Sequence, residues 1–401
     1  MPDFLQLPRE DQREALLVAA ERSGRPLHLL EKDVWVVWAL HHLFTGPHAQ
    51  YLVFKGGTSL SKAYSVIKRF SEDVDLTYDI RAIAPDLIEK ADSPWPTSRS
   101  QEKKWSKAIR QRLAELVSGK LAPDLTKALT EHGLPAKARA EGEQIFINYD
   151  AFGEGTGYVR PSVLLEFGAR STGEPNEPRP VACDAAPHLP EVRFPSASPQ
   201  VMRPERTFWE KATAIHVFCA QGSFRGGDRY ARHWHDVTRL DAAGFADSAA
   251  KDRALANAVA EHKSIFFAES TPDGAPIDYR AAVTGTLTLA PAGEARKALV
   301  EDYQRTGHFT EYWHELLDVG HRSTDAAVRS LALEMPSYGD IPVDSASIDQ
   351  LSKILKSDPD RQVREMAAFR LGLSREPERA LQAFRESFSS ESDLCVRWAI
   401  F

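Results

Sequence analysis

The chain has 401 residues, a formal net charge of −7 at pH 7 and 42% hydrophobic residues. This composition is typical of a soluble globular protein of two or three domains. It excludes a disordered chain and a protein that coats nucleic acid through bulk positive charge, although a local basic site is compatible with it. Three widely spaced cysteines exclude a disulfide framework or a zinc knuckle. The longest apolar stretch, 34–44, is about half of a membrane span, so we expect a cytoplasmic protein that does not enter the membrane.

The N-terminal part predicts alternating helices and strands. Helices are expected over 11–23 and 31–44, followed by an apolar strand over 51–54 that ends at a glycine turn. A helix capped by Thr58 is expected to run to about Ile67. Residues 73–78 alternate with a period of two and predict a half-buried strand. A helix at about 99–118 and strands at 145–149 and 162–167 follow, and the Pro-rich segment 172–205 reads as a loop with one short strand near Val192.

The C-terminal part reads differently, because from Thr207 onward the pattern is almost wholly helical apart from 268–294. An α+β unit followed by a helical bundle is therefore the expected architecture. The predicted boundaries are an α/β core over 1–205, a helical lobe over 206–335 and a separate helical tail over 345–401.

The tail contains a weak internal repeat at an offset of 33 residues. The aligned pairs are Leu351 with Phe384, Leu355 with Phe388, Asp360 with Asp393, Val363 with Val396 and Arg364 with Arg397. Each copy reads as helix, acidic turn and helix, which resembles HEAT-type repeats, and an ordinary four-helix tail is the alternative. We expect the surface that includes Arg364 and Arg397 to bind a protein partner.

Two aspartates stand in the strand predicted over 73–78. Residues two apart on a strand project from the same face, so Asp73 and Asp75 are expected to present two carboxylates a few ångströms apart. Like charges this close usually imply a cation between them, and hard oxygen ligands with no nearby cysteine favour Mg²⁺ or Mn²⁺. A D-x-D pair also occurs often by chance, and a solvated strand end is then the alternative.

The turn before this strand has the features of an anion site. Gly56, Gly57, Thr58 and Ser59 enter a helix, where backbone N–H groups, hydroxyls and the helix dipole favour a phosphate, and Lys62 follows one turn later. The spacing is neither that of a P-loop nor that of a serine hydrolase, and such a turn is often only a turn. A phosphate-binding turn beside metal-binding carboxylates nevertheless predicts the transfer of a nucleotidyl group from a nucleoside triphosphate.

These motifs resemble a known family. The run from Glu31-Lys32-Asp33 through FKGGTSLSKAY and RFSEDVDL resembles the AbiEii/AbiGii nucleotidyltransferase toxins of bacterial abortive-infection and toxin–antitoxin systems, which include the MenT toxins. Segments 163–170, 206–212 and 232–237 resemble three later motifs of that family in the expected order, and the resemblance spans roughly 10–325 without the tail. It implies a DNA polymerase β-like fold, a cognate antitoxin, a third metal-binding carboxylate and possible base at Glu166, an essential lysine at Lys211 and an essential aspartate at Asp236.

The residues around these later positions agree with the resemblance without naming an activity. Phe208, Ala212, Ile215 and Cys219 form a helical core stripe, beside which Lys211 could reach a triphosphate. On the next helix Asp236 shares a face with Arg232 and Arg239, and it could orient Lys211, bind nucleotide or act as a base. His233 and His235 are expected to pack or cap rather than bind a metal, because no third soft ligand is evident.

Two basic groups could hold an acceptor. Six basic residues between 99 and 112, with Trp105 among them, could follow a phosphate backbone and stack a base, or could simply form a solvated helix. Arg225, Arg229 and Arg232 form a second group that suits an RNA end or an acidic protein partner.

We therefore expect a toxin that transfers a nucleoside monophosphate from an NTP to RNA, at the 3′ end of tRNA, and so inhibits translation in a toxin–antitoxin or phage-defence system. Two alternatives remain open. The same chemistry could act on a protein or on a small molecule such as an aminoglycoside. The chain could instead be a nucleotide-binding sensor that works through its helical tail.

Overall fold

The structure is a computed structural model. It describes residues 1–67, 73–89, 95–152, 161–222, 230–305, 317, 320–334, 343, 345–374 and 376–400. The chain divides into two compact units: residues 1–210 with 239–268 form unit 1, and residues 211–238 with 269–401 form unit 2. This division differs from the boundaries expected from the sequence, which stay a prediction. Each unit is described by itself.

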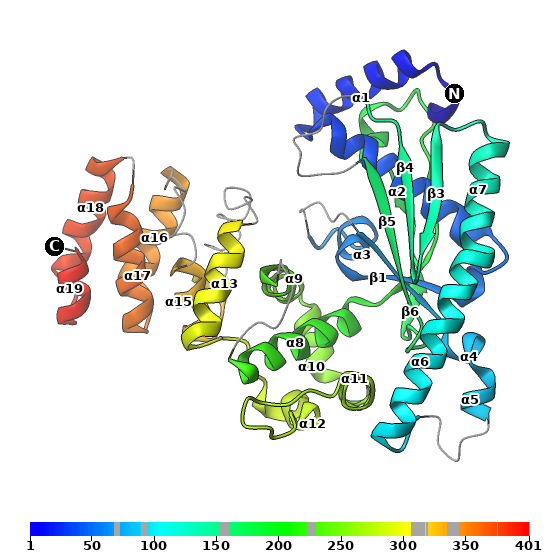
Figure 1. Ribbon diagram of the computed structural model, residues 1–401. Helices are drawn as coiled ribbons and strands as arrows, with labels where there is room; N and C mark the ends of the chain where they lie inside the picture. The colour runs from blue at the N-terminus through cyan, green and yellow to red at the C-terminus, as the bar shows by residue number, and fades with distance from the viewer. Residues whose placement is uncertain are drawn as a thin grey trace. The chain divides into compact units, whose positions relative to one another are not determined.

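Unit 1 is built on a mixed sheet that has seven strands in the described part of the chain (Figure 1). In sheet order these are β3 (Ala136–Glu141), β4 (Gln144–Tyr149), β5 (Ser162–Gly168), β2 (Asp73–Tyr78), β1 (Leu52–Lys55), β9 (Gln200–Met202) and β6 (Asn176–Pro178). The pairs β2–β5 and β1–β9 are parallel, whereas the other neighbours are antiparallel. A small second sheet pairs β7 (Val181–Ala182) with β8 (Ser196–Ala197).

The helices of unit 1 pack on this sheet and on one another. They are α1 (Arg9–Ser23), α2 (Leu27–Thr45), α3 (Gly56–Lys62), α4 (Ile80–Ile83), α5 (Pro85–Glu89), α6 (Arg99–Leu116), α7 (Ala122–Glu131), α10 (Phe245–Lys251) and α11 (Arg253–Phe266). Helix α2 is buried nearly all round because it contacts α1, α7 and β5 at once. The central strands β2 and β5 alternate between side chains buried in the core and half-buried ones, so one sheet face stays partly open.

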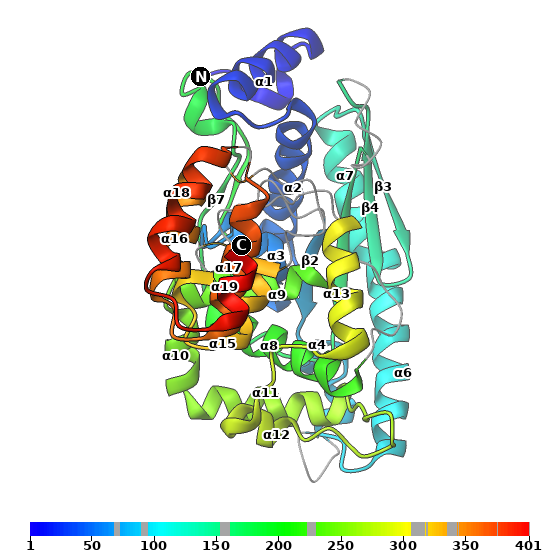
Figure 2. The same ribbon diagram turned by 90° about the vertical axis from the view of Figure 1, so that its left-hand side faces the viewer.

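Unit 2 is helical. Helices α8 (Pro204–Gln221) and α9 (Ala231–Ala242) contribute residues to both units, and unit 2 continues with α12 (Tyr279–Ala281), α13 (Gly293–Arg305), α15 (Ala326–Glu334), α16 (Ser345–Ser357), α17 (Arg361–Gly372), α18 (Pro377–Phe388) and α19 (Leu394–Ile400). In the tail, α16 packs on α18, and α17 packs on both α15 and α19, so the helices form two layers (Figures 1 and 2). Their apolar faces close a second hydrophobic core.

Most of the predicted elements occur. The α+β class, the strand over 73–78 and the helical C-terminal part are confirmed. Three expectations were wrong. The helix after the glycine turn ends at Lys62 rather than near Ile67, and Thr58 does not cap it. The segment 172–205 carries four short strands, whereas near Val192 there is only an isolated bridge between Arg193 and Asp3. No helix in the described ranges is long and apolar enough to cross a membrane.

Candidate active site

The predicted carboxylates lie together at one end of the sheet of unit 1. Asp75 on β2 is the Cα partner of Glu166 on the parallel strand β5, and Asp73 stands two residues earlier on β2. Directly opposed residues on paired strands project from the same face with Cβ atoms about 5 Å apart. Burial raises the pKa of Glu166, and the negative charges of Asp75 and Asp73 raise it further. The fold therefore gathers three like charges at a half-buried place.

The register extends this cluster into a row across four strands. Lys55 at the end of β1 is opposite Asp75, and Gln144 at the start of β4 is opposite Glu166. The Gln144 amide donates a hydrogen bond of 2.5 Å to Glu166 Oε1, which orients that carboxylate. The hydrogen bond and the positive charge of Lys55 both lower the pKa of Glu166, against the larger effects of burial and of Asp75. We call Lys55, Asp75, Glu166 and Gln144 the polar row.

The glycine turn lies directly against the polar row, because Gly56 contacts the side chain of Asp75. Gly56 has φ +77°, and a Cβ atom built on it would stand 2.0 Å from Asp75 Oδ2. No side chain fits at this position, because both the backbone conformation and the space require glycine. The first glycine of the motif is therefore explained by its contact with the carboxylate rather than by phosphate binding alone.

The hydroxyls of the turn are used inside the protein. Thr58 Oγ1 donates to the carbonyl of Asp73, and Ser59 Oγ donates to the carbonyl of Gly56 at 2.9 Å. Both side chains are almost fully buried. These hydroxyls therefore hold the turn against β2, and a phosphate at this place would meet backbone groups of Gly57 and its neighbours instead.

Lys62 is not available to a phosphate in this structure. Its Nζ atom lies 2.6 Å from Asp33 Oδ1 and 2.7 Å from Asp184 Oδ1, and the side chain is only 8% exposed. Burial alone would lower the pKa of Lys62, but the two carboxylates outweigh it and raise the pKa. Asp33 also accepts a hydrogen bond from the backbone of Asp184. This network explains Asp33 of the Glu31-Lys32-Asp33 motif as structural support for α3, and we leave Lys62 out of the nucleotide site.

The donor chemistry of the three carboxylates fits a hard divalent cation. All three side chains offer oxygen atoms, and the negative charges of Asp75 and Asp73, which raise the pKa of Glu166, would be stabilised by a cation placed among the carboxylates. Within the described residues, however, no group of three or more His, Cys, Asp or Glu side chains is arranged closely enough to hold a metal ion as it stands.

A cluster of cations that the sequence analysis missed lies next to Lys55. Arg206 on α8 donates to Glu210 Oε1 at 3.1 Å, and Lys263 comes from α11. Burial alone would raise the pKa of Glu210, but Lys55, Arg206, Lys263 and His262 together lower it to about 2. One carboxylate thus stays ionised among several positive groups. Only the Arg206 and Glu210 positions fall inside a recognisable motif, so Lys263 had no signal in the sequence.

The aromatic ring of Phe267 lies beside this cationic cluster. The guanidinium of Arg170 lies 4.4 Å from the centre of the Phe267 ring, and Lys263 Nζ lies 4.7 Å from it. Phe267 is 37% exposed, and the imidazole of His262 bonds the carbonyl of Arg170 at 2.9 Å. Two cations and an accessible ring in one place are features of sites that bind phosphates and stack bases.

Lys211 and Asp236 form an ion pair in unit 2. Lys211 Nζ lies 2.9 Å from Asp236 Oδ2, and the carboxylate is fully buried. His235 Nδ1 contacts the other oxygen of Asp236 at 3.0 Å. Of the three roles that the sequence left open for Asp236, this geometry favours the orientation of Lys211. It also agrees with the packing role expected for His235.

The tryptophan of the basic helix α6 is not exposed to solvent. Trp105 is 5% exposed and belongs to the core, so of the two alternatives left open by the sequence, base stacking by Trp105 does not fit the structure. Arg112 pairs with Asp86 at 2.5 Å, and Arg99 with Glu102 at 3.3 Å, while Lys103, Lys104 and Lys107 are exposed. The helix thus fits the solvated alternative at least in part. Arg225 and Arg229 lie outside the described residues.

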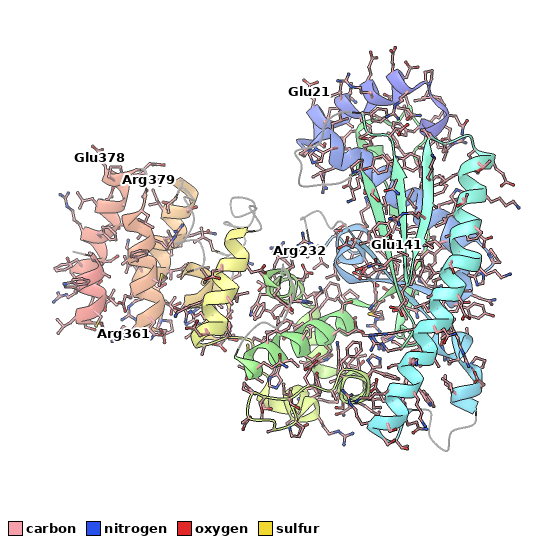
Figure 3. The ribbon with its side chains drawn as sticks, in the orientation of Figure 1. Glu21, Glu141, Arg232, Arg361, Glu378 and Arg379 are labelled. Carbon is pink, nitrogen blue, oxygen red and sulfur yellow. The ribbon has the colours of Figure 1, made fainter. Side chains whose placement is uncertain are left out.

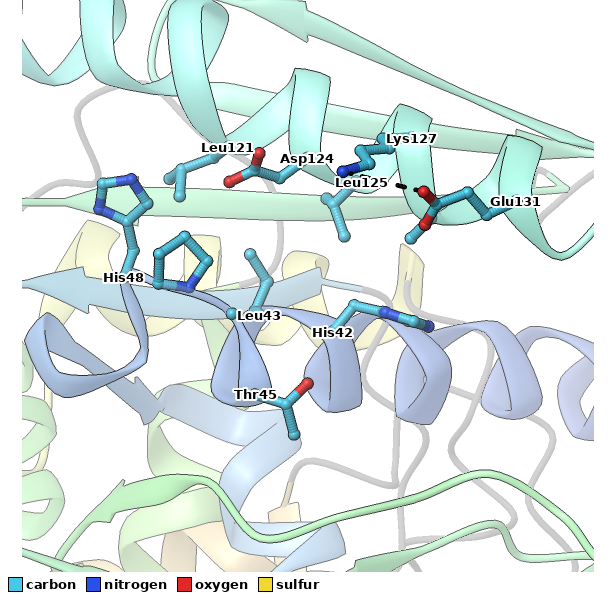
Figure 4. A pocket seen from close by; sticks show the side chains of 12 residues that line it. His42, Leu43, Thr45, His48, Leu121, Asp124, Leu125, Lys127 and Glu131 are labelled. Carbon is cyan, nitrogen blue, oxygen red and sulfur yellow. Dashed lines mark ion pairs between the residues drawn. The ribbon is translucent and has the colours of Figure 1, made fainter.

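Two surface pockets of unit 1 lie elsewhere. One, of about 280 Å³, is lined by His42, His48, Asp124 and Glu131 among others (Figure 4). The other, of about 480 Å³, is lined by His41, His132 and Arg193 among others. Neither contains a residue of the polar row, so neither bears on the predicted chemistry.

A carboxylate cluster beside a glycine turn and a group of cations is the kind of site that a phosphoryl- or nucleotidyl-transferring protein needs. Comparison with known families makes the class definite: the model of the family described as "Nucleotidyl transferase AbiEii toxin, Type IV TA system" matches residues 38–329. The chain belongs to this family of nucleotidyltransferase toxins. No curated protein matches the chain.

Proposed function

We propose that the protein transfers a nucleoside monophosphate from an NTP to the 3′ end of an RNA, with tRNA as the acceptor, and so stops translation until an antitoxin counteracts it. The observation that carries this proposal is the polar row, in which Asp75 and Glu166 stand side by side with Asp73 close by. Membership of the AbiEii family supports the transfer of a nucleotidyl group and the antitoxin. The RNA acceptor is our own inference from the cationic cluster and Phe267.

In this proposal each of the candidate residues has its own role. Asp73, Asp75 and Glu166 would hold Mg²⁺ or Mn²⁺, which when bound neutralises the triphosphate and aligns the attacking hydroxyl. The acceptor's 3′ oxygen attacks the α-phosphorus, the bond from that phosphorus to the β-phosphate oxygen breaks, and pyrophosphate leaves. We assign the proton of the hydroxyl to the carboxylate of Glu166, which lies directly opposite Asp75 on the neighbouring strand.

The phosphates would be bound by backbone groups of Gly57, Thr58 and Ser59 and by Lys55. Lys263 and Arg206 are the proposed neighbours of the acceptor's last phosphates, with Phe267 stacking a base. Lys211 would stabilise developing negative charge, in line with its place in the family motif, and Asp236 would keep it oriented. We further propose that the sheet belongs to the DNA polymerase β-like type and that the tail is a short HEAT-like array.

The test is transfer from α-labelled NTPs, each supplied separately with Mg²⁺, to total tRNA, total protein or an aminoglycoside. We expect label on tRNA, and sequencing of the RNA 3′ ends gives the nucleotide and the number added. Label on protein or on the small molecule alone would refute the RNA acceptor. Asp75→Asn is the inactive control and Asp124→Asn, on the exposed side of α7, is the matched active one.

The cationic cluster has its own test. Lys263→Gln should raise the KM for RNA several-fold with little change in the KM for NTP, whereas Lys55→Gln should act on both kcat and the KM for NTP. Lys107→Gln, on the exposed face of α6, is the control for nonspecific charge. Equal effects of Lys263→Gln and Lys107→Gln would contradict the assignment of Lys263.

A further inference from the structure

The tail of unit 2 repeats one local structure three times. Helices α15, α17 and α19 are each capped by an aspartate, because Asp325, Asp360 and Asp393 each accept hydrogen bonds from the backbone N–H groups two and three residues further on. An arginine follows four residues after each of these aspartates, at Arg329, Arg364 and Arg397. The three arginines therefore occupy equivalent places in the repeat.

Two of these arginines tie their helix to the next helix pair. Arg329 forms a bidentate ion pair with Asp358, at 2.7 and 2.9 Å, and Arg364 forms one with Glu391, at 2.7 and 3.1 Å. Each of these acids lies in the turn after the first helix of the next pair. Each also accepts a hydrogen bond of 2.9 Å from the cap aspartate that follows it. The arginine–acid pair thus connects each repeat to the next one.

The third arginine, Arg397, occupies the same position in the repeat but has no carboxylate partner among the described residues. The guanidinium of Arg397 lies 4.9 Å from the centre of the Phe388 ring, and its only hydrogen bond among the described residues is a long one to the Phe388 carbonyl, at 3.4 Å. Its Nε atom is buried and has no hydrogen-bond partner within the described chain. In Arg329 and Arg364 this same atom donates to a carboxylate. A buried N–H group without a partner destabilises the folded state, and a bound carboxylate would satisfy it.

The apolar side chains around Arg397 show the same difference. Leu381 and Phe388 correspond to Ile348 and Leu355 one repeat earlier, which are 2% and 1% exposed, yet they are themselves 48% and 39% exposed. Helix α19 adds Leu394 at 78% and Trp398 at 84%, where α17 carries the charged residues Arg361 and Glu365. Other ends of the tail helices carry charged residues instead, as Arg361, Glu378 and Arg379 show (Figure 3).

We propose that this end surface, formed by Leu381, Phe388, Leu394, Arg397 and Trp398, binds a helical segment of another protein that ends in an acidic turn. The partner's apolar side chains would cover Phe388 and Trp398, and its carboxylate would pair with Arg397 as Glu391 pairs with Arg364. Charge complementarity disfavours a second copy, because a symmetric pair would place one Arg397 against the other. Arg364, which the sequence placed on the same binding surface, is paired with Glu391 and is therefore not part of it.

The chain itself supplies the probe for this surface. A stapled, fluorescently labelled peptide of residues 377–393 carries α18 and Glu391, which is the chemistry that Arg364 already recognises. Added to the full-length protein, it should bind saturably by fluorescence anisotropy. Arg397→Glu should weaken binding at least tenfold, and a peptide with Glu391→Arg should restore binding to that variant. Arg385→Glu, exposed on α18, is the matched control in the protein.

Three outcomes would overturn the proposal. One is the absence of saturable binding to a protein whose thermal melt shows a folded tail. A second is binding that depends on Arg364 rather than Arg397, because the peptide would then only exchange with the chain's own α18. A third is a concentration-dependent dimer that Trp398→Glu abolishes in sedimentation, because the occupant would then be a second copy. Arg397→Glu should leave nucleotide transfer unchanged, so this proposal and the proposed function fail separately.

Discussion

The polar row of unit 1 and the tail of unit 2 use charge in opposite ways. In the row, Asp75 and Glu166 are held side by side by strand pairing, and burial with mutual repulsion raises the pKa of Glu166. In the tail, each buried carboxylate that recurs with the repeat faces an arginine, as in the pair of Arg329 with Asp358. Like charges held close together destabilise the folded state, so their presence indicates a binding or catalytic site. Opposite charges paired at the same position of each repeat indicate that they hold neighbouring repeats together.

This difference decides where a substitution should act. A neutral residue in the polar row removes repulsion and should spare or raise stability while it removes activity. A neutral residue in the tail leaves a buried charge without its partner, and should lower stability while it spares the chemistry. The following predictions test that contrast, from the largest expected effect to the smallest.

Asp75→Asn should abolish nucleotide transfer, by about a hundredfold or more, because it removes a charge that the transferring group and its cation need. The melting temperature should stay the same or rise, because Glu166 loses a like-charged neighbour. Transfer assays and thermal melts on the same preparation give both quantities. A large fall in melting temperature would mean that Asp75 is structural, and the contrast with the tail would be lost.

Gly56→Ala should also inactivate the protein, because the added methyl group would collide with Asp75 Oδ2 and the backbone is at φ +77°. A non-glycine residue in this conformation costs about 1–3 kcal/mol. Gly119→Ala is the control, since nothing lies within 4 Å of the Cβ position there. Transfer activity and the midpoint of urea unfolding are the measurements. Unchanged activity in Gly56→Ala would show that the carboxylate has room to move and that the turn does not position it.

Arg329→Ala should destabilise the tail by about 3–5 kcal/mol, because it leaves Asp358, which is 7% exposed, as an unpaired buried charge. Lys356→Ala removes the exposed pair with Glu386 and should cost less than about 1 kcal/mol. Hydrogen exchange resolved to the tail helices measures both losses, and transfer by either variant should be unchanged in solution below the unfolding temperature. Similar losses for the two variants would show that the repeating pairs are no more than surface ion pairs.

Glu31 differs from both regions, because among the described residues this buried carboxylate forms no ion pair with an arginine. Burial raises its pKa from 4.5 to about 7, against the hydrogen bond from the Phe152 N–H and the charge of Arg9. The folded state therefore keeps this proton to higher pH than the unfolded state, and the free energy of unfolding should fall as pH rises from about 4.5 to 7, by on the order of 3 kcal/mol in total. Glu31→Gln should flatten that part of the curve in urea melts between pH 5 and 8. An unchanged slope in the variant would place the proton elsewhere.

Much of the site could be read from the residues alone because it depends on local spacing. The alternation over 73–78 predicted the strand and the shared face of Asp73 and Asp75, and the order of motifs led to Glu166. What the sequence could not supply was strand order. Only the pairing of β1 with β2 and of β2 with β5 brings Lys55 and Glu166 to opposite sides of Asp75.

Long-range packing also reversed some local readings. Lys62 follows the glycine turn at a spacing that suits a phosphate, but Asp33 and Asp184 come from distant segments and enclose it. Trp105 lies among basic residues, yet its face of α6 packs into the core. In both cases the side chain's neighbours are far away in the sequence, so no local pattern contains them.

The sequence by itself determined the elements that carry their own period: the strand with its two aspartates, the amphipathic helices and the offset of 33 residues in the tail. The tertiary structure decided which charges meet. Strand register gathers the carboxylates, the packing of α11 contributes Lys263, and the stacking of α17 on α19 shows that Arg397 stands where Arg329 and Arg364 bind an acid. The reason is physical: periodicity follows from backbone geometry within a few residues, whereas the energy of a charge depends on every group that folding brings within a few ångströms.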